Sequence, residues 1–382
     1  MNTALQCEMR RKSIHLMMGV FCMTLPWIFS SPWQVDLLAA ISVSILLLIR
    51  WFTPRFGKIL HEVKRLSFGE LLFPVAITIL FRLSADDLEI YLPSVAILTF
   101  ADAAGALFGK RYGKHLYYTN AGQKSLEGSL AVFLVSTFIT FTLGPSGDLP
   151  NTLLIALIVG LIATMAEGIL GAGIDNIVLP LTIYGLLSFL NELNLIELLS
   201  RIGIIFTLST ILFAVRRITT LNGGGLLSVT VFGYLCYALG GSLYLIAPLT
   251  FFAIHLVTTW NFPKLKELAH SANTVAAITL PGIIWLSLAR SSTYSPSTCL
   301  LGFSLAFVAQ ISLIHTATHH HLNKPSGTLA CLVKALLVSL SSWHPIALAP
   351  PIAVRWLGPL NRVEQSLLSF IFSLMALIPI IK

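Results

Sequence analysis

Apolar runs about as long as a membrane is thick recur from one end of this chain to the other. A helix needs about 20 apolar residues to cross a hydrocarbon core roughly 30 Å thick. Backbone polar groups in lipid must be hydrogen-bonded internally, so only helices or a closed barrel can span it. These runs lack the alternation of barrel strands, and only 10% of the 382 residues are charged. The sequence therefore predicts an all-α, polytopic integral membrane protein.

We expect about 13–15 transmembrane helices, the first of them retained because no cleavage site is evident. The candidate segments are 13–30, 35–52, 70–83, 90–108, 126–143, 151–167, 175–190, 196–215, 224–239, 241–259, 273–289, 299–315, 327–343, 345–357 and 363–381.

Basic residues predict the orientation of these helices. Arg10, Arg11 and Lys12 precede the first helix, which places the N-terminus in the cytoplasm. Alternation then puts most of the remaining lysines and arginines in cytoplasmic segments. The net charge of +8 thus reflects loop asymmetry, and we expect no nucleic-acid partner. A bacterial inner membrane is the expected location.

The chain divides into two halves of different character. Residues 1–215 contain nearly every polar group that lies in or beside a predicted helix. Residues 216–382 are more uniformly apolar after a glycine-rich start. We therefore expect two membrane domains, 1–215 and 216–382.

One acid lies near the cytoplasmic end of the predicted helix 90–108. Asp102 shares a helical face with Gly105 and Gly109, which would let a backbone or a ligand approach closely. A charge at this depth usually faces a partner or a polar cavity. The alternative is a simple ion pair with Lys110 or Lys114.

The segment 109–125 is a basic, glycine-containing loop that leads into another acid. Its cations are Lys110, Arg111, Lys114 and Lys124. Glycines such as Gly113 suit close approach of the backbone to phosphates, beside Ser125. Glu127 opens the next helix and either contacts a metal or hydroxyl, or simply favours the helix dipole. Anchoring to anionic lipids is the alternative for the whole loop.

A second polar stretch, AEGILGAGIDNIVLP, covers residues 166–180. It places Glu167 at the end of one helix, and Asp175 and Asn176 at the start of the next. Their oxygen atoms are ligands of the kind that Mg²⁺ takes alongside phosphate oxygens. The alternative is that Gly168 and Asp175 only cap the two helices.

Two further groups contain histidine. Lys12, His15 and Gly19 share a helical face near the N-terminus, and flanking charge explains Arg11 and Lys12 but not a histidine one turn inside the membrane. Near the C-terminus, His315 and His319 are spaced i, i+4 like metal ligands, followed by His320 and His321. No acid or cysteine nearby completes a site, so we expect an interfacial polar loop there.

Together these residues predict a phosphate-transfer site. Asp102, Glu127, Glu167 and Asp175 can hold a divalent metal, and the basic loop can hold a polyphosphate. All lie where cytoplasmic water meets acyl chains, so the acceptor is expected to be a membrane-embedded alcohol or phosphate. Phosphoryl transfer needs mainly positioning and charge stabilisation.

The motifs FADAAGALFGKRYGK and QKSLEGSLAVF resemble the signature of polyprenol-type lipid kinases and of phosphatidate cytidylyltransferase. Arg11-Lys12 with His15 and Gly19, and Glu167 with Gly173-Ile174-Asp175-Asn176, resemble the kinase branch, which includes dolichol, phytol and diacylglycerol kinases. The cytidylyltransferase pattern expects a histidine and an arginine that are absent here. The resemblance covers roughly residues 8–215.

This resemblance implies transfer of the γ-phosphate of CTP, with Mg²⁺, to an isoprenoid alcohol. It implies a catalytic group of Asp102, Lys124, Glu127 and Asp175. It also implies nucleotide contacts by Lys110, Arg111, Gly113, Lys114 and Ser125. The implied metal ligands are Asp102, Glu167, Asp175 and Asn176, with Arg11, Lys12 and His15 nearby. The alternatives are synthesis of a CDP-lipid, or a transporter.

The second half has a weaker resemblance, to the membrane family that includes phytyl-phosphate kinase. It is carried by RRITTLNGGGLLSVTVFGYLCYALGG and by HSANTVAAI. The acidic central motif of that family would fall near His315–His319, where the chain reads HTATHHH. We therefore expect the second half to be degenerate or purely structural.

Overall fold

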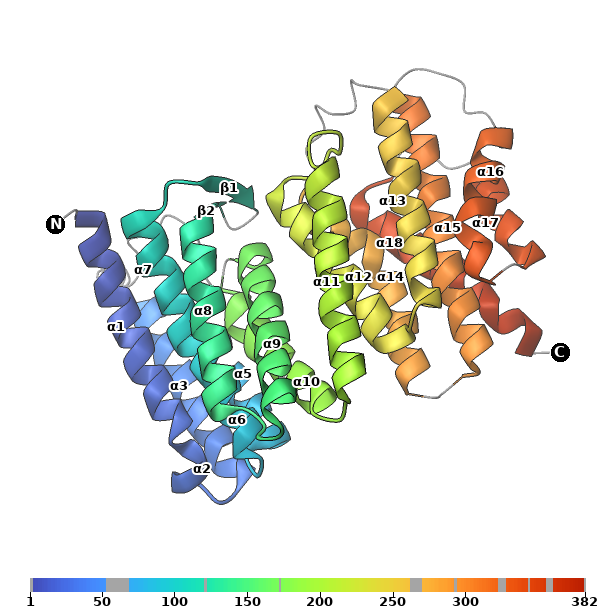
Figure 1. Cartoon of the computed structure of the whole chain (residues 1–382). Coiled ribbons are helices and arrows are strands. Elements are labelled where there is room, and N and C mark those ends of the chain that lie inside the picture. The colour runs from blue at the N-terminus through green and yellow to red at the C-terminus, as the bar shows by residue number, and fades with distance from the viewer. Residues whose placement is uncertain are drawn as a thin grey trace. The chain divides into compact units, whose positions relative to one another are not determined.

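The computed structural model of the chain is helical almost throughout (Figure 1). It describes residues 3–52, 69–119, 122–171, 173–261, 270–291, 294–321, 328–342, 344–354 and 360–380. Some of the segments that alternation from a cytoplasmic N-terminus puts in the cytoplasm fall partly outside these residues, at 53–68, 262–269 and 322–326. The chain forms two compact units, Met1–Gly203 and Ile204–Lys382. The division falls inside helix α11 (Leu195–Val215), on the N-terminal side of the boundary that the sequence suggested at 215/216.

The helices of unit 1 form a bundle, with a short hairpin at one end. Its elements are α1 (Thr3–Met23), α2 (Leu25–Ile28), α3 (Pro32–Phe52), α5 (Gly69–Ser84), α6 (Leu88–Ala96), η1 (Ile97–Ala101), α7 (Asp102–Tyr112), β1 (Leu116–Thr119), β2 (Gly122–Ser125), α8 (Leu126–Leu143), α9 (Leu149–Ile169) and α10 (Asp175–Leu190).

Unit 2 is almost entirely helical in its described residues, apart from turns and one isolated β-bridge between Leu221 and His270. Its elements after α11 are α12 (Gly223–Gly240), α13 (Leu243–Asn261), α14 (Ala272–Arg290), α15 (Pro296–His321), α16 (Thr328–Val338), η3 (Ser339–Ser342), η4 (Pro345–Leu348), α17 (Ala349–Val354), α18 (Arg362–Ser373) and η5 (Leu374–Ile380). Aromatic side chains of α14 and α15, including Trp285, Phe303 and Phe307, form the centre of its core.

The protein is an all-α, polytopic membrane protein, as the sequence predicts. Among the described residues, eight helices are long and apolar enough to cross a membrane, and three shorter apolar helices accompany them. The higher count of about 13–15 came from hydropathy alone. Several of those segments are divided or short in the structure: 345–357 contains η4 and α17, and 363–381 contains α18 and η5. The orientation in the membrane stays a prediction.

The longest span of unit 1 contains a local widening. Helices α6, η1 and α7 run continuously from Leu88 to Tyr112, and η1 between them is a π-helical segment. Such segments are rare inside α-helices and often lie at functional sites. Here η1 ends immediately before Asp102, so it sets the direction in which that side chain leaves the helix.

The structure corrects the expectation that 109–125 is simply a loop. Helix α7 continues to Tyr112, and the strands β1 and β2 then pair antiparallel, with Leu116 opposite Ser125 and Thr119 opposite Gly122. Gly122 has a φ of 114°, a conformation that other residues rarely adopt. The hairpin therefore holds Lys124 on a defined strand directly before α8.

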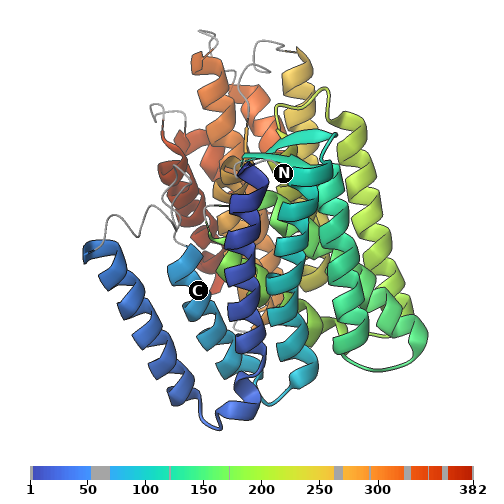
Figure 2. The ribbon, with the colours of Figure 1, turned by 90° about the vertical axis from the view of Figure 1, so that its left-hand side faces the viewer.

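The two ends of unit 1 differ in charge. The start of α1, the end of α7 and the hairpin lie at one end and carry Lys12, Lys110, Arg111, Lys114 and Lys124; Figure 1 and Figure 2 both show the N-terminus of α1 and the hairpin at the same end of the bundle. The turns at the other end carry acids instead, at 86–89, 148 and 192. This asymmetry is what the positive-inside rule describes.

The histidine run HTATHHH is helical, not a loop. Helix α15 continues to His321, and the side chain of His315 is buried, with 3% of its surface exposed. The expectation of an interfacial polar loop is therefore wrong for His315. The side chains of His320 and His321 lie outside the described part of the structure.

Candidate functional site

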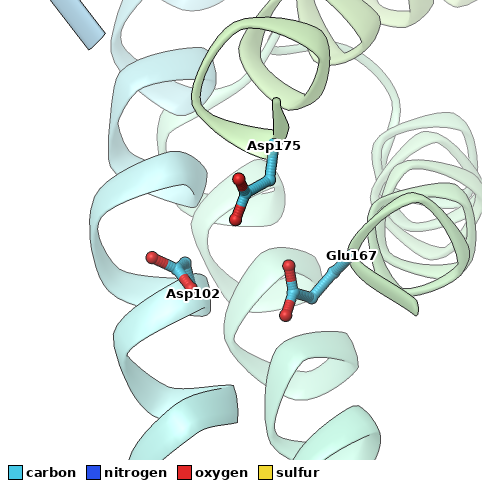
Figure 3. A group of neighbouring side chains, drawn as sticks. All are labelled: Asp102, Glu167 and Asp175. Carbon is cyan, nitrogen blue, oxygen red and sulfur yellow. The ribbon is translucent and has the colours of Figure 1, made fainter. Parts of the chain in front are cut away.

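Three carboxylates from three different elements meet at the hairpin end of unit 1 (Figure 3). Asp102 is the first residue of α7, Glu167 lies in the last turn of α9, and Asp175 is the first residue of α10. One oxygen atom from each lies within 4.8 Å of the others. Like charges this close repel each other, so the three carboxylates need positive charge nearby to be stable.

The turn between α9 and α10 brings Glu167 and Asp175 together. Helix α9 ends at Ile169 and α10 begins at Asp175, and Gly173 between them has a φ of 87°. The capping alternative does not describe Asp175, because the residue at the N-cap position is Ile174 and no side chain caps this helix. The Asp175 carboxylate points toward the other two acids instead (Figure 3).

Asp102 is held by two residues of α1. Lys12 Nζ lies 2.5 Å from Asp102 Oδ2, and both side chains are almost completely buried. His15 Nε2 lies 3.1 Å from the carbonyl oxygen of Leu98, in the π-helical segment, and 3.5 Å from Asp102 Oδ2. The α1 face that the sequence singled out therefore packs directly against the acid.

Glu167 is held by the hairpin. Lys124 Nζ donates a hydrogen bond of 2.6 Å to Glu167 Oε1 and a second one to the backbone oxygen of the same residue. Gly109 and Gly128 let α7 and α8 approach closely: a Cβ atom on Gly128 would lie 2.8 Å from the Gly105 oxygen and 3.1 Å from Gly109 Cα. This close packing of α7 against α8 places the hairpin over the acids.

Two fully buried oxygen atoms of the cluster lack a hydrogen bond in the described part of the chain. Glu167 Oε2 and Asp175 Oδ1 are buried and have no hydrogen-bond partner among the described residues. Buried polar atoms in proteins nearly always have such a partner. Three carboxylates against two lysines also leave a net negative charge. Buried carboxylate oxygens without hydrogen bonds, in a group with net negative charge, suit a divalent cation that prefers oxygen ligands, such as Mg²⁺.

Glu8 is a site residue that the sequence reasoning missed. Its carboxylate accepts hydrogen bonds from Lys110, at 2.5 Å, and from Arg11. Burial alone raises the pKa of this carboxyl, but the hydrogen bonds from the two cations outweigh it and hold the pKa below its ordinary value of 4.5. Glu8 lies four residues before Lys12 on the same helical face, and that spacing was the signal available.

The other predicted residues lie around the cluster rather than in it. Glu127 accepts a hydrogen bond of 2.8 Å from His115 Nδ1 instead of joining the carboxylates. Asn176 Nδ2 donates to the Gly69 oxygen at 2.8 Å. Ser125 caps α8 by accepting from the Gly128 N–H at 3.1 Å.

The predicted nucleotide contacts fall into two kinds. Arg111 at the end of α7 and Lys114 directly before the hairpin are both exposed, and the Arg111 guanidinium lies over the ring of Tyr112. Gly113 is a close-packing position, because a Cβ atom there would lie 2.3 Å from the Gly109 oxygen and 2.8 Å from Ser125 Oγ. Lys110 is bound to Glu8. The basic residues therefore form a rim outside the acids.

Comparison with known proteins adds one relationship. A phytol kinase from Synechocystis sp. is 27% identical over 187 residues, which is 46% of this chain and 76% of the relative. The chain resembles the phytol and polyprenol kinase family. No family model matches the chain, and no solved structure matches it. The resemblance drawn from the motifs of the first half is thus supported by a match that covers 46% of the chain.

Proposed function

We propose that this protein is a membrane-embedded kinase that transfers the γ-phosphate of a nucleotide, CTP, to an isoprenoid alcohol with the help of Mg²⁺. The observation that carries the proposal is the group of three carboxylates within 4.8 Å, two of whose buried oxygens lack a hydrogen bond. The similarity to a phytol kinase supports the choice of acceptor.

Asp102, Glu167 and Asp175 are the residues that would hold the metal. Mg²⁺ bound there would supply positive charge that offsets the negative charge of the donor phosphates, including the charge that develops during transfer. Glu167 Oε2 and Asp175 Oδ1 are buried ligand atoms without a hydrogen bond among the described residues. Glu167 Oε1 and Asp102 Oδ2 already accept from Lys124 and Lys12, so Asp102 would offer its other carboxylate oxygen.

The lysines supply fixed positive charge on either side of the acids. Lys12 and Lys124 are bound within the cluster and keep the carboxylates from repelling one another. Arg111 and Lys114 on the rim are exposed and are free to meet the α- and β-phosphates of a nucleotide that arrives from water. Cations at these positions lower the cost of bringing a triphosphate to a negative cluster.

The reaction requires little covalent chemistry from the protein. The alcohol oxygen attacks the γ-phosphorus, the bond to the β–γ bridging oxygen breaks, and CDP leaves with that oxygen. The proton of the alcohol passes to a carboxylate of the cluster. The cluster lies where the candidate span α9 ends and the shorter apolar helix α10 begins. There a prenol hydroxyl at the lipid surface would meet cytosolic nucleotide, in a multi-pass protein of a bacterial inner membrane.

The proposal is tested with purified protein, labelled CTP or ATP, and a panel of phytol, geranylgeraniol, undecaprenol and diacylglycerol. We expect CDP and a prenyl phosphate. Pyrophosphate and a CDP-lipid would contradict the kinase and indicate a cytidylyltransferase. Asp102→Asn is expected to abolish transfer, and Asp148→Asn is the matched control, because Asp148 is an exposed acid at the opposite end of α9.

A further inference from the structure

The carboxylate of Glu8 holds two cations next to each other at the hairpin end of unit 1. Its Oε2 atom accepts a hydrogen bond of 2.5 Å from Lys110 Nζ, and its Oε1 atom accepts one from Arg11. Lys110 belongs to α7 and Arg11 to α1, two helices that pack against each other (Figure 1). Because the two oxygens belong to one carboxylate, the ammonium and the guanidinium lie side by side.

The acid of this group is buried, and the two cations are not. Only 8% of the Glu8 side chain is exposed, against 45% for Lys110 and 55% for Arg11. Glu8 therefore lies beneath the cations on the protein side, and water reaches the cations from the other side. Two cations and one carboxylate carry a net charge of +1, so the exposed side of the group attracts anions.

Most of the N–H donors of this group have no carboxylate to bind. An ammonium has three donors and a guanidinium has five, and neither has an acceptor. Glu8 takes one donor from each cation. No other carboxylate lies within ion-pair distance of Lys110 or Arg11 in the described part of the chain. Two adjacent cations with donors toward water suit the oxygen atoms of a phosphate chain.

The group lies beside the acid cluster. Glu8 and Lys12 share one face of α1, and Lys12 is bound to Asp102 of the cluster. Four residues of helix correspond to about 6 Å along its axis. The phosphates of one nucleotide can therefore extend from the cluster to the pair of cations that Glu8 holds.

We propose that Glu8 is a positioning residue for the nucleotide, and that it holds Lys110 and Arg11 together so that both bind the phosphates that are not transferred. This role rests on the proposed kinase function, because it requires a polyphosphate donor. Without Glu8 the two cations would repel each other. Their long side chains would also regain freedom that nucleotide binding must then remove.

Two other roles for Glu8 lead to different results. A carboxylate that only ties α1 to α7 would change the stability of the protein but not its affinity for nucleotide. A carboxylate that competes with the phosphates for the cations would weaken nucleotide binding, so its removal would strengthen binding. The burial of Glu8 favours positioning, because phosphates can reach the remaining donors from the exposed side without displacing the carboxylate.

The test measures binding of CTP, labelled with ³²P in its α-phosphate, to the full chain in lipid nanodiscs with Mg²⁺. No alcohol is added, so that binding is measured without transfer. The variants are Glu8→Gln, Lys110→Gln and the double variant, and unlabelled tripolyphosphate is used as a competitor that lacks the nucleoside. Asp36→Asn is the matched control, because it also removes the acid of an ion pair, with Arg82.

We expect Glu8→Gln to bind CTP about tenfold more weakly than the wild type, which corresponds to one lost charge-assisted hydrogen bond. Tripolyphosphate should lose affinity by a similar factor, and the control should stay within about twofold of the wild type. Glu8→Gln should have little further effect in the Lys110→Gln background, because the two residues act as one unit. In transfer to phytol, the KM for CTP should rise while kcat stays unchanged.

Unchanged or tighter binding of CTP by Glu8→Gln, or fully additive effects of the two substitutions, would overturn the positioning role. If Glu8→Gln does not fold, Glu8→Asp decides: its shorter side chain keeps the charge but cannot reach both cations, so weaker CTP binding is again expected, and unchanged binding would overturn the role. A wild type that binds no CTP would overturn both the role and the kinase. A wild type that binds CTP but transfers no phosphate would overturn only the kinase, and the binding of the variants would still decide the role of Glu8.

Discussion

Lys12 of α1 and Asp102 of α7 form a buried ion pair, with Nζ and Oδ2 2.5 Å apart across 90 residues of chain. The pair fixes the N-terminal helix against the span that carries the acid cluster. It also shows how the cluster tolerates three carboxylates: each of two acids has its own lysine, and both lysines come from elements outside the acids' own helices.

Breaking this pair is expected to cost stability as well as activity. Lys12→Met leaves Asp102 buried and charged, and removal of one partner of a buried pair typically costs about 3–5 kcal/mol. Thermal unfolding in detergent measures the loss. Arg82→Met is the control, because it breaks an exposed ion pair with Asp36 that is expected to contribute about 0–1 kcal/mol. Equal effects of the two substitutions would contradict the buried, structural role of Lys12.

The contact between α7 and α8 predicts that Gly128 tolerates no larger side chain. Gly128→Val would force the helices apart, because even a Cβ atom at this position lies 2.8 Å from the Gly105 oxygen. Overpacking of this kind typically costs about 1–3 kcal/mol, and displacement of the hairpin would lower transfer activity. Gly185→Ala is the control in α10, where nothing lies within 4 Å of the added atom. It is expected to preserve stability or raise it by about 0.5–1 kcal/mol.

The Mg²⁺ concentration that transfer requires should depend on the buried carboxylate oxygens that have no hydrogen bond. Asp175→Asn removes one charge and one buried ligand atom, so we expect the Mg²⁺ concentration that supports half-maximal transfer to rise about tenfold or more. EDTA should abolish transfer by the wild type, and added Mg²⁺ should restore it. An unchanged Mg²⁺ titration in Asp175→Asn, with Asp148→Asn as the reference, would remove Asp175 from the metal site.

Glu8 predicts a pH dependence of stability. Its carboxyl has a lower pKa in the folded protein than its ordinary 4.5, so the unfolded chain binds its proton first as the pH falls. The contribution of Glu8 is therefore complete above its ordinary pKa, and is lost as the pH falls through the lower folded value. Comparison of wild type and Glu8→Gln between pH 3 and 7 measures this. The difference in unfolding free energy between wild type and Glu8→Gln should become smaller as the pH falls. A difference that becomes larger as the pH falls would contradict a lowered pKa of Glu8 in the folded protein.

Much of the structure of unit 1 could be predicted from its sequence, because the features that carry the prediction lie within short stretches of the chain. Apolar length predicted the spans, and the short glycine-containing turn after Glu167 predicted that Glu167 and Asp175 lie near each other. The basic and acidic turns predicted which end carries the site. These inferences depend on residues close together in the chain, where spacing limits the possible geometry.

The partners of the acids were not predictable in the same way. Lys12 meets Asp102, Lys124 meets Glu167, and Glu8 meets Lys110 through packing between distant segments, which spacing does not determine. The hairpin was missed because a short, glycine-containing basic stretch is also typical of a loop. His315 was expected in a loop because its run is polar, yet α15 buries it against α13 and α16.

Asp102, Glu167 and Asp175 are proposed to form one site for phosphate transfer to a membrane alcohol. The decisive experiment follows label from [γ-³²P]CTP to phytol with the wild type and with Glu167→Gln, and uses Asp148→Asn as the control. We expect label in phytyl phosphate with the wild type and the control, and a loss of at least about 100-fold with Glu167→Gln. Equal transfer by all three proteins would contradict it.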